Sequence, residues 1–180
     1  MDRVDGAGMS ALMLAIEHGS TKIAQLLLKR GAQVDLQDNG GKSALMLAIK
    51  HRSTEIAQLL LERGAQMDLQ DNDGKSALIY AVEGNFYEVV QLLLERGAGV
   101  ELQDRDGRIA LIYASQIGHL DITMLLLKGK GPEWGLVNAH YLESAVVTAR
   151  GRNHFHIEEF IKVCLLHLNK MYNTLLIFVI

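Results

Sequence analysis

The sequence predicts an all-α repeat solenoid, in which helix-turn-helix repeats are separated by hairpin-like loops. The main observation is the block Ser-Ala-Leu-Met-Leu-Ala-Ile, which occurs at residues 10–16 and, letter for letter, at residues 43–49. Related blocks begin at Ser76 and Ile109, so the spacing stays constant at 33 residues. A segment this short cannot bury its own apolar face. A fixed period of this size therefore indicates copies of one supersecondary unit stacked on each other.

Each repeat is expected to open with a short helix, as at Ala44 to Ile49, that is apolar nearly all round because its copies cover it. Ser43 precedes this helix, and Ser10 and Ser76 take the same place in their repeats. A serine there caps the first turn, and its loss typically costs about 1 kcal/mol. Ile109 replaces the serine in the fourth repeat, so the N-terminus of that helix is predicted to be less stable.

Small side chains recur at one register position of the first helix. The residues are Ala15, Ala48, Ala81 and Ala114. This pattern predicts a close approach of helices that a larger side chain would block.

The second helix of each repeat is predicted to be amphipathic. In the segment from Thr54 to Arg63, the residues Ile56, Leu59 and Leu60 fall at positions i, i+3 and i+4 and predict one apolar stripe. The residues directly after this helix in the first three repeats are Gly31, Gly64 and Gly97. Glycine there favours a left-handed residue that ends the helix. Residues 66–75 and their copies are rich in turn formers and predict a hairpin-like loop.

These residues resemble the ankyrin-repeat family over about residues 6–130. The resemblance rests on the turn Asp71 to Gly74, the Ala-Leu-x-x-Ala core of the first helix, the segments Gly118 to Ile122 and Gly31 to Asp35, and the Leu-Leu-Leu runs. It implies an ankyrin-repeat solenoid that binds other molecules with loop tips and the concave helix face. The chain lacks the proline and histidine of the family's Thr-Pro-Leu-His signature. Apolar packing is expected at the histidine position, which holds Met13, Met46, Ile79 and Ile112.

The repeats predict two regions, repeats one to four over residues 1–132 and a diverged fifth repeat with an apolar C-terminal helix or tail over residues 133–180. Between them, Pro132 and its glycine neighbours interrupt the pattern, which returns in the segments Ser144 to Arg150 and Ile157 to Val163. Residues 165–180 are read either as a final helix that folds back over the stack or as a truncated end. Together with the bare first repeat, the apolar end favours a fragment of a longer protein.

Bulk composition gives no sign of nucleic-acid or membrane binding. The net charge is −3 with 22% charged residues, and Cys164, the single cysteine, permits no intramolecular disulfide. The N-terminus lacks a secretory signal, and the apolar run from Thr174 to Ile180 is too short to span a bilayer. We expect a cytoplasmic protein, with the nucleus as the alternative, that is monomeric unless its exposed end faces pair.

No catalytic, cofactor or metal site is predicted. Asp71-Asn-Asp-Gly resembles a calcium loop, but Leu69 stands at the first ligand position and Tyr80 at the last, so a tight turn is favoured. Gly41-Lys42-Ser43 lacks the spacing of a phosphate loop. Tyr80 and Tyr113 occupy the register of Leu14 and Leu47, which favours packing over stacking on nucleic-acid bases.

The segment from His154 to His167 carries the weakest alternative, an enzyme or metal-binding protein. It contains His154, His156 and Cys164, but their spacing matches no common metal site. Solvent-facing histidines and a core cysteine are the expected outcome.

The resemblance implies a non-catalytic protein-protein interaction module or scaffold, whose protein or peptide partner the sequence does not identify. The alternative is the targeting arm of a larger signalling protein such as a kinase, ubiquitin ligase or channel. Mixed charges along the expected surface favour a protein over a phosphate backbone. The candidate partner-binding residues are Glu17, His18, Asn39, Lys42, Lys50, His51, Asn72, Asp73, Lys75, Glu83, Arg105, Asp106, Arg108 and Gln116.

Overall fold

A computed structural model describes residues 3–128 and 139–166, which form helices joined by tight turns and extended loops. The chain divides into two compact units, an N-terminal unit of residues 1–107 and a C-terminal unit of residues 108–180. Among the described residues, extended pairing is limited to isolated bridges such as Gln37 with Ser43 and Gln70 with Ser76. The predicted all-α solenoid is confirmed.

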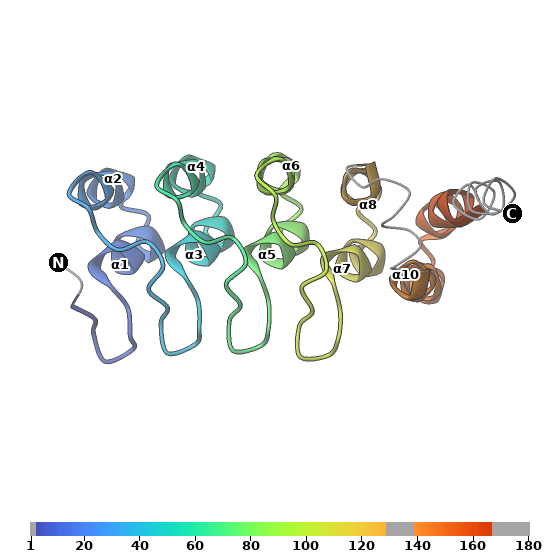
Figure 1. The fold of residues 1–180 in the computed structure, drawn as a ribbon, viewed down its shortest axis with the longest axis horizontal. Coiled ribbons are helices and arrows are strands. Elements are labelled where there is room, and N and C mark those ends of the chain that lie inside the picture. Colours follow the sequence, from blue (N-terminus) through green and yellow to red (C-terminus); the bar gives the residue numbers. More distant parts are fainter. Residues whose placement is uncertain (1–2, 129–138, 167–180) are drawn as a thin grey trace, which may run out of the picture. The chain divides into compact units, whose positions relative to one another are not determined.

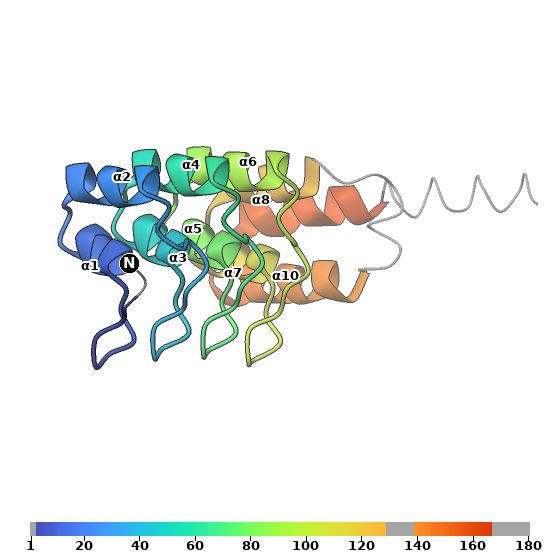
Figure 2. The same cartoon turned by 60° about the vertical axis from the view of Figure 1, so that its left-hand side comes forward.

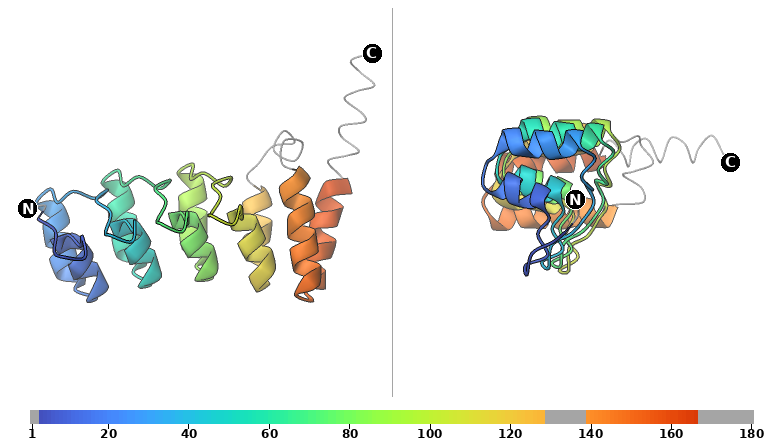
Figure 3. Two further views of the ribbon diagram at one scale, coloured as in Figure 1. Left: turned by 90° about the horizontal axis from the view of Figure 1, so that it is seen from below. Right: turned by 90° about the vertical axis from the view of Figure 1, so that its left-hand side faces the viewer.

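The N-terminal unit holds three stacked helix pairs. The inner helices are α1 (Ala11–Glu17), α3 (Ala44–Lys50) and α5 (Ala77–Glu83), and the outer helices are α2 (Thr21–Lys29), α4 (Thr54–Glu62) and α6 (Tyr87–Glu95). Within this unit the inner helices form one layer and the outer helices a second (Figure 1). The loops project from the same side of the unit as neighbouring fingers (Figures 2 and 3).

The C-terminal unit contains α7 (Ala110–Ile117), α8 (Leu120–Lys128), α10 (Ala139–Gly151) and helical backbone over residues 155–166. α7 packs against both α8 and α10. Glu158 ties the last two helices together, because its buried carboxylate accepts bonds from Arg150 at 2.6 Å and Lys162 at 2.5 Å. These two cations hold the pKa of Glu158 down to about 2. The predicted interruption around Pro132 and the apolar tail from residue 167 lie outside the described residues, and the boundary at residues 132/133 stays a prediction.

Serine caps begin the inner helices of the N-terminal unit, as predicted. The hydroxyls of Ser10, Ser43 and Ser76 accept the backbone N–H three residues on, at 3.3, 3.4 and 3.4 Å. In α1 the Met13 thioether also accepts the Ser10 N–H at 3.5 Å, in the place of a capping-box glutamate. Ile109 gives α7 no side-chain cap. Met13, Met46, Ile79 and Ile112 are all buried, which confirms the predicted apolar packing.

The alanines that recur at one position of the inner helices accept a hydrogen bond from the turn that joins the two helices of a repeat. Ala48 and Ala81 are 0% exposed, and their carbonyls accept N–H groups from Ser53 at 2.8 Å and Phe86 at 2.9 Å. The same turn occurs between α10 and the next helix, where the His154 N–H donates to Ala149 at 2.8 Å. The last helix pair therefore repeats the geometry of the regular repeats.

The outer helices end as expected, but their buried stripe differs from the prediction. Gly31, Gly64 and Gly97 have φ angles of 80°, 80° and 86°, which confirms left-handed termini. In α4 the buried residues are Ile56, Ala57, Leu60 and Leu61, whereas Leu59 is only half-buried. The stripe is rotated toward Ala57 because α4 packs on its own inner helix, α3, and on the preceding outer helix, α2, at once. No helix in the described part of the chain is long and apolar enough to cross a membrane.

Candidate protein-interaction surface

The hairpin tips are held in shape by aspartates that recur with the repeat. The Asp38 carboxylate accepts the N–H groups of Gly40 and Lys42, both at 2.8 Å. Asp71 accepts those of Asp73 at 2.9 Å and Lys75 at 2.8 Å. Each carboxylate replaces hydrogen bonds that a sheet partner would otherwise supply. The loops of the N-terminal unit are thus held in their conformation by their own side chains.

Neighbouring loops are joined by a set of bonds that we call the loop ladder. Its side-chain rungs include the amides of Asn39, which donates to the Gly6 carbonyl at 3.1 Å, and Asn72, which donates to the Asn39 carbonyl at 2.9 Å. The amides of Gln37 and Gln70 likewise donate to the carbonyls of Gln70 at 2.9 Å and Gln103 at 2.7 Å. Its backbone rungs include the Asn72 N–H to Gly40 and the Arg105 N–H to Asp73, both at 2.9 Å. Adjacent fingers therefore form a continuous structure within the N-terminal unit.

The loop ladder changes the role of two predicted contact residues. Asn39 and Asn72 are exposed, but their NH₂ groups already donate to the preceding loop. Their predicted role in partner contact stays a prediction, whereas their structural role is evident. The sequence contained the signal, because both asparagines share one register position directly after the turn aspartate.

The other candidates lie on what we call the inner surface, formed by the hairpin tips of residues 38–42, 71–75 and 104–106 and the C-terminal ends of α1, α3 and α5. Its exposed candidates are Glu17, His18, Lys50, His51, Asp73, Arg105 and Asp106. Lys42 is half-buried, and Lys75 pairs with Glu83 at 2.6 Å, with their side chains 24% and 31% exposed. The structure thus places exposed charges of both signs on this surface of the N-terminal unit.

Two candidates belong to the C-terminal unit. The Arg108 guanidinium lies 4.9 Å from the centre of the Tyr113 ring, a cation-π contact on a buried tyrosine. Gln116 is half-buried, and its backbone carbonyl lies 3.2 Å from Nε2 of His154. Both residues thus have contacts within their own unit.

Tyr80 has a polar contact that packing arguments did not predict. Its hydroxyl donates to the buried carboxylate of Asp71 at 2.6 Å, which fastens α5 to the adjoining hairpin. Burial and this hydrogen bond raise the pKa of the Tyr80 phenol well above its ordinary value. Tyr113, by contrast, is buried as predicted.

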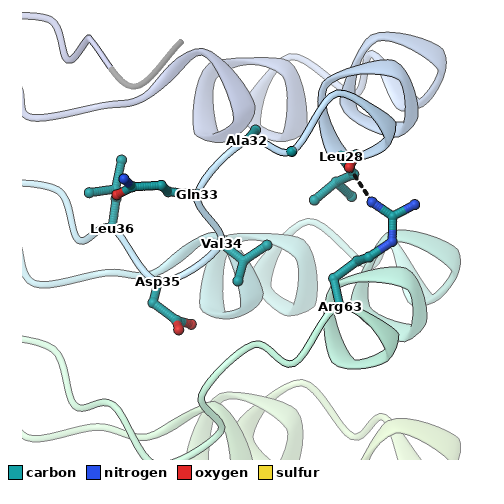
Figure 4. Close-up of a pocket in the computed structure, with 8 residues that line it drawn as sticks. Leu28, Ala32, Gln33, Val34, Asp35, Leu36 and Arg63 are labelled. Carbon is teal, nitrogen blue, oxygen red and sulfur yellow. Dashed lines mark hydrogen bonds between the residues drawn. The ribbon is translucent and has the colours of Figure 1, made fainter.

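A hollow of about 490 Å³ opens beside the loop between the first two repeats (Figure 4). The Arg63 guanidinium reaches across it and donates to the Leu28 carbonyl at the end of α2. The Asp35 carboxylate accepts the backbone N–H of Gln66 at 2.8 Å. Since its polar groups already join the two repeats, the hollow is a junction between repeats, and the sequence did not predict it.

The segment after α10 differs from its prediction at two residues. His156 is exposed as expected, but His154 is half-buried, with its ring against Gly118. Cys164 is also half-buried instead of fully in the core, and this burial raises the pKa of its thiol. His167 lies outside the described residues. Over residues 3–128 and 139–166, no three His, Cys, Asp or Glu side chains gather as a metal site would require.

His119 should make the stability of the C-terminal unit depend on pH. Its Nε2 is buried without a hydrogen-bond partner, and burial together with the nearby His154 lowers its pKa below the ordinary value of 6.5. The neutral form is therefore favoured on folding. The stability that neutral His119 contributes is fully present above pH 6.5, the pKa of an ordinary histidine. It is lost as the pH falls through the lowered pKa of His119 in the folded state. We expect the urea midpoint to decrease between about pH 7 and pH 5, and this decrease to be smaller in His119→Gln. An equal decrease in both proteins would contradict this assignment.

The fold and its surfaces define the class of protein as an all-α repeat solenoid. A family model described as ankyrin repeats, in three copies, matches residues 1–71 and 63–138. These matches cover well over half of the chain, which therefore belongs to the ankyrin-repeat family. Members of this family generally mediate protein-protein interactions and are typically non-catalytic. No curated protein matches the sequence significantly.

Proposed function

We propose that this protein is a non-catalytic interaction module that binds a protein or peptide through the inner surface. The observation that carries the proposal is the loop ladder, which holds several hairpin tips in one arrangement beside the ends of the inner helices. Because these loops are ordered before binding, association loses little conformational entropy. The family's general role supports the same conclusion.

Exposed charges on this surface supply the recognition chemistry. Lys50 and Arg105 are cationic, Glu17 and Asp73 are anionic, and all four are exposed. A partner with alternating charges complements such a row better than a uniformly charged polymer does. Lys75 is less suited to direct contact, since its charge is already paired with Glu83.

Alanine substitution of Lys50, Asp73 and Arg105 together tests the proposal. The residues are exposed, and the side chains are not rungs of the loop ladder. A partner is first isolated with the unmodified chain as bait. We expect the triple variant to keep its helical circular dichroism and urea midpoint but to bind this partner at least about tenfold more weakly, as loss of central contacts does. Isothermal titration calorimetry measures the affinity.

The matched control is alanine at Lys29, Glu62 and Glu88, which are exposed on the outer helices of the same unit. It also removes three charges, but none from the inner surface, and should bind as the unmodified chain does. Equal loss of binding in both triple variants would contradict binding through the inner surface. Full binding by the Lys50, Asp73 and Arg105 variant would contradict it as well.

A further inference from the structure

Basic residues concentrate at the second repeat of the inner surface. Lys42 lies in its hairpin, Lys50 ends α3, and Arg52 follows in the turn to α4. We call these three residues the cation cluster. Lys50 and Arg52 are exposed, and Lys42 is half-buried. The same register positions hold Met9, Glu17 and Gly19 in the first repeat and Lys75, Glu83 and Asn85 in the third. Within the N-terminal unit, this excess of positive charge is thus specific to the second repeat.

The third repeat shows which group a lysine at the hairpin position binds. The Lys75 ammonium donates to the Glu83 carboxylate at 2.6 Å. Lys42 and Lys50 hold the same two positions in the second repeat, so a second ammonium group replaces the carboxylate. The second repeat therefore lacks an anion that the third repeat supplies from its own inner helix.

Neighbouring acidic side chains do not pair with the cation cluster. Asp38, in the same hairpin as Lys42, accepts the backbone N–H groups of Gly40 and Lys42 through its Oδ1, both at 2.8 Å. The Lys42 ammonium lies over Gly40, near that oxygen, without forming an ion pair. Glu17, at the register position of Lys50 in the preceding repeat, also forms no ion pair with residues 3–128 or 139–166. The charges of Lys50 and Arg52 are therefore left for a ligand to neutralise.

Arg52 supports a functional role independently, because its backbone is strained. Its φ is 60°, in the left-handed region that residues with a side chain rarely adopt. The same turn position holds Gly19, Asn85 and Asn153, which are residue types that tolerate this conformation. The Arg52 guanidinium lies 5.1 Å from the centre of the Phe86 ring, which keeps the cation at the surface beside α3. A strained, exposed cation at this position indicates selection for a function other than stability.

We infer that the cation cluster binds an acidic segment of the partner, whose carboxylates take the place that Glu83 has beside Lys75. This inference rests on the proposed function, because the cluster belongs to the inner surface. It also fixes where the segment lies: Asp73 and Glu83 make the third repeat unfavourable for a second acidic group. The acidic segment therefore aligns the partner with the second repeat.

A short capped peptide of glutamates between glycine and serine tests the inference, with a glutamine version of the peptide as its control. Binding is followed by the amide NMR signals of the full chain. Lys50→Glu reverses one charge of the cluster. Lys29→Glu is the matched variant, since it changes the net charge equally at an exposed position of α2. α2 also carries Lys22 and ends at Arg30, so this variant tests the other group of exposed cations in the same unit.

We expect the glutamate peptide to shift the signals of residues 50–52 in a saturable way, and the glutamine peptide not to do so. Lys50→Glu should weaken binding at least about tenfold, whereas Lys29→Glu should bind as the unmodified chain does. The fold should accept Lys50→Glu, because Glu17 and Glu83 hold this position in neighbouring repeats. Equal weakening by both variants, or equal binding of both peptides, would overturn the inference.

Arg52→Asn separates binding from stability. We expect it to weaken binding of the glutamate peptide about threefold, as loss of one exposed charge does. The urea midpoint should not fall, because asparagine adopts this conformation at Asn85. Unchanged peptide binding would contradict the role of Arg52.

This inference and the proposed function can fail separately. If the Lys50, Asp73 and Arg105 variant loses the isolated partner but Lys50→Glu binds the glutamate peptide normally, only the acidic segment is contradicted. If the glutamate peptide responds as expected but that triple variant keeps the partner, the proposed function is contradicted instead.

Discussion

Replacement of Ala48 by leucine is expected to lower the free energy of unfolding by about 3 kcal/mol. Ala48 is 0% exposed, and its carbonyl accepts the Ser53 N–H at 2.8 Å in the turn between α3 and α4. A leucine side chain has no space there, because helices pack on α3 from both neighbouring repeats. The helices must separate or the side chain must adopt a strained rotamer, and either change weakens the stack.

The control for this prediction is Ala11→Leu in α1, which adds the same atoms within an identical seven-residue block. Ala11 is exposed, so the free energy of unfolding should change by less than about 0.5 kcal/mol. Urea unfolding monitored by circular dichroism measures both variants. A similar loss in both would mean that leucine acts through helix propensity and not through packing between repeats.

Gly41→Ala should also destabilise the N-terminal unit, by about 3 kcal/mol, because the strain of a left-handed alanine adds to a steric clash with the next loop. Gly41 has a φ of 78°, and an added Cβ would lie 2.7 Å from the backbone nitrogen of Asn72. That nitrogen donates to the Gly40 carbonyl as a rung of the loop ladder. It cannot move away without breaking this bond, so the clash is not easily relieved.

Gly64→Ala separates the two costs. Gly64 has a φ of 80° at the end of α4, but no atom lies within 4 Å of an added Cβ. This variant should lose only about 1 to 2 kcal/mol, the cost of the left-handed conformation alone. Urea midpoints of the two variants give the difference. Equal losses would show that the close approach of neighbouring loops adds nothing to stability.

The sequence predicted the features whose physical cause is local. Ser43 caps the helix that follows it, and Gly64 ends the helix before it, so each can be recognised from its own neighbours. Ala48 was predicted from the period alone, since only a close approach requires a small residue in every copy. The period also placed the apolar replacements of the family's histidine correctly, because a stacked helix leaves those positions no contact with water.

Features that depend on a neighbouring repeat were harder to predict. Asn72 looked like a free tip residue because its acceptor, the Asn39 carbonyl, lies 33 residues away and carries no side-chain signature. The Tyr80 hydroxyl was missed because leucine holds its position in the first two repeats, which favoured pure packing. His154 was placed in solvent, since nothing periodic links it to Gly118, whose missing side chain leaves room for its ring. Which exposed residues contact a partner cannot be derived from periodicity, because solubility alone also requires charged residues.

The loop ladder has a consequence for how such a protein can diverge. Its asparagine rungs end on main-chain carbonyls, at Gly6 and Asn39, which every amino acid carries. Each repeat thus supplies this bond with its own asparagine, provided that the loop before it keeps a glycine such as Gly41, whose missing side chain permits the close approach. Substitutions at most tip positions can therefore accumulate under selection for a new ligand without a compensating change in the adjacent repeat.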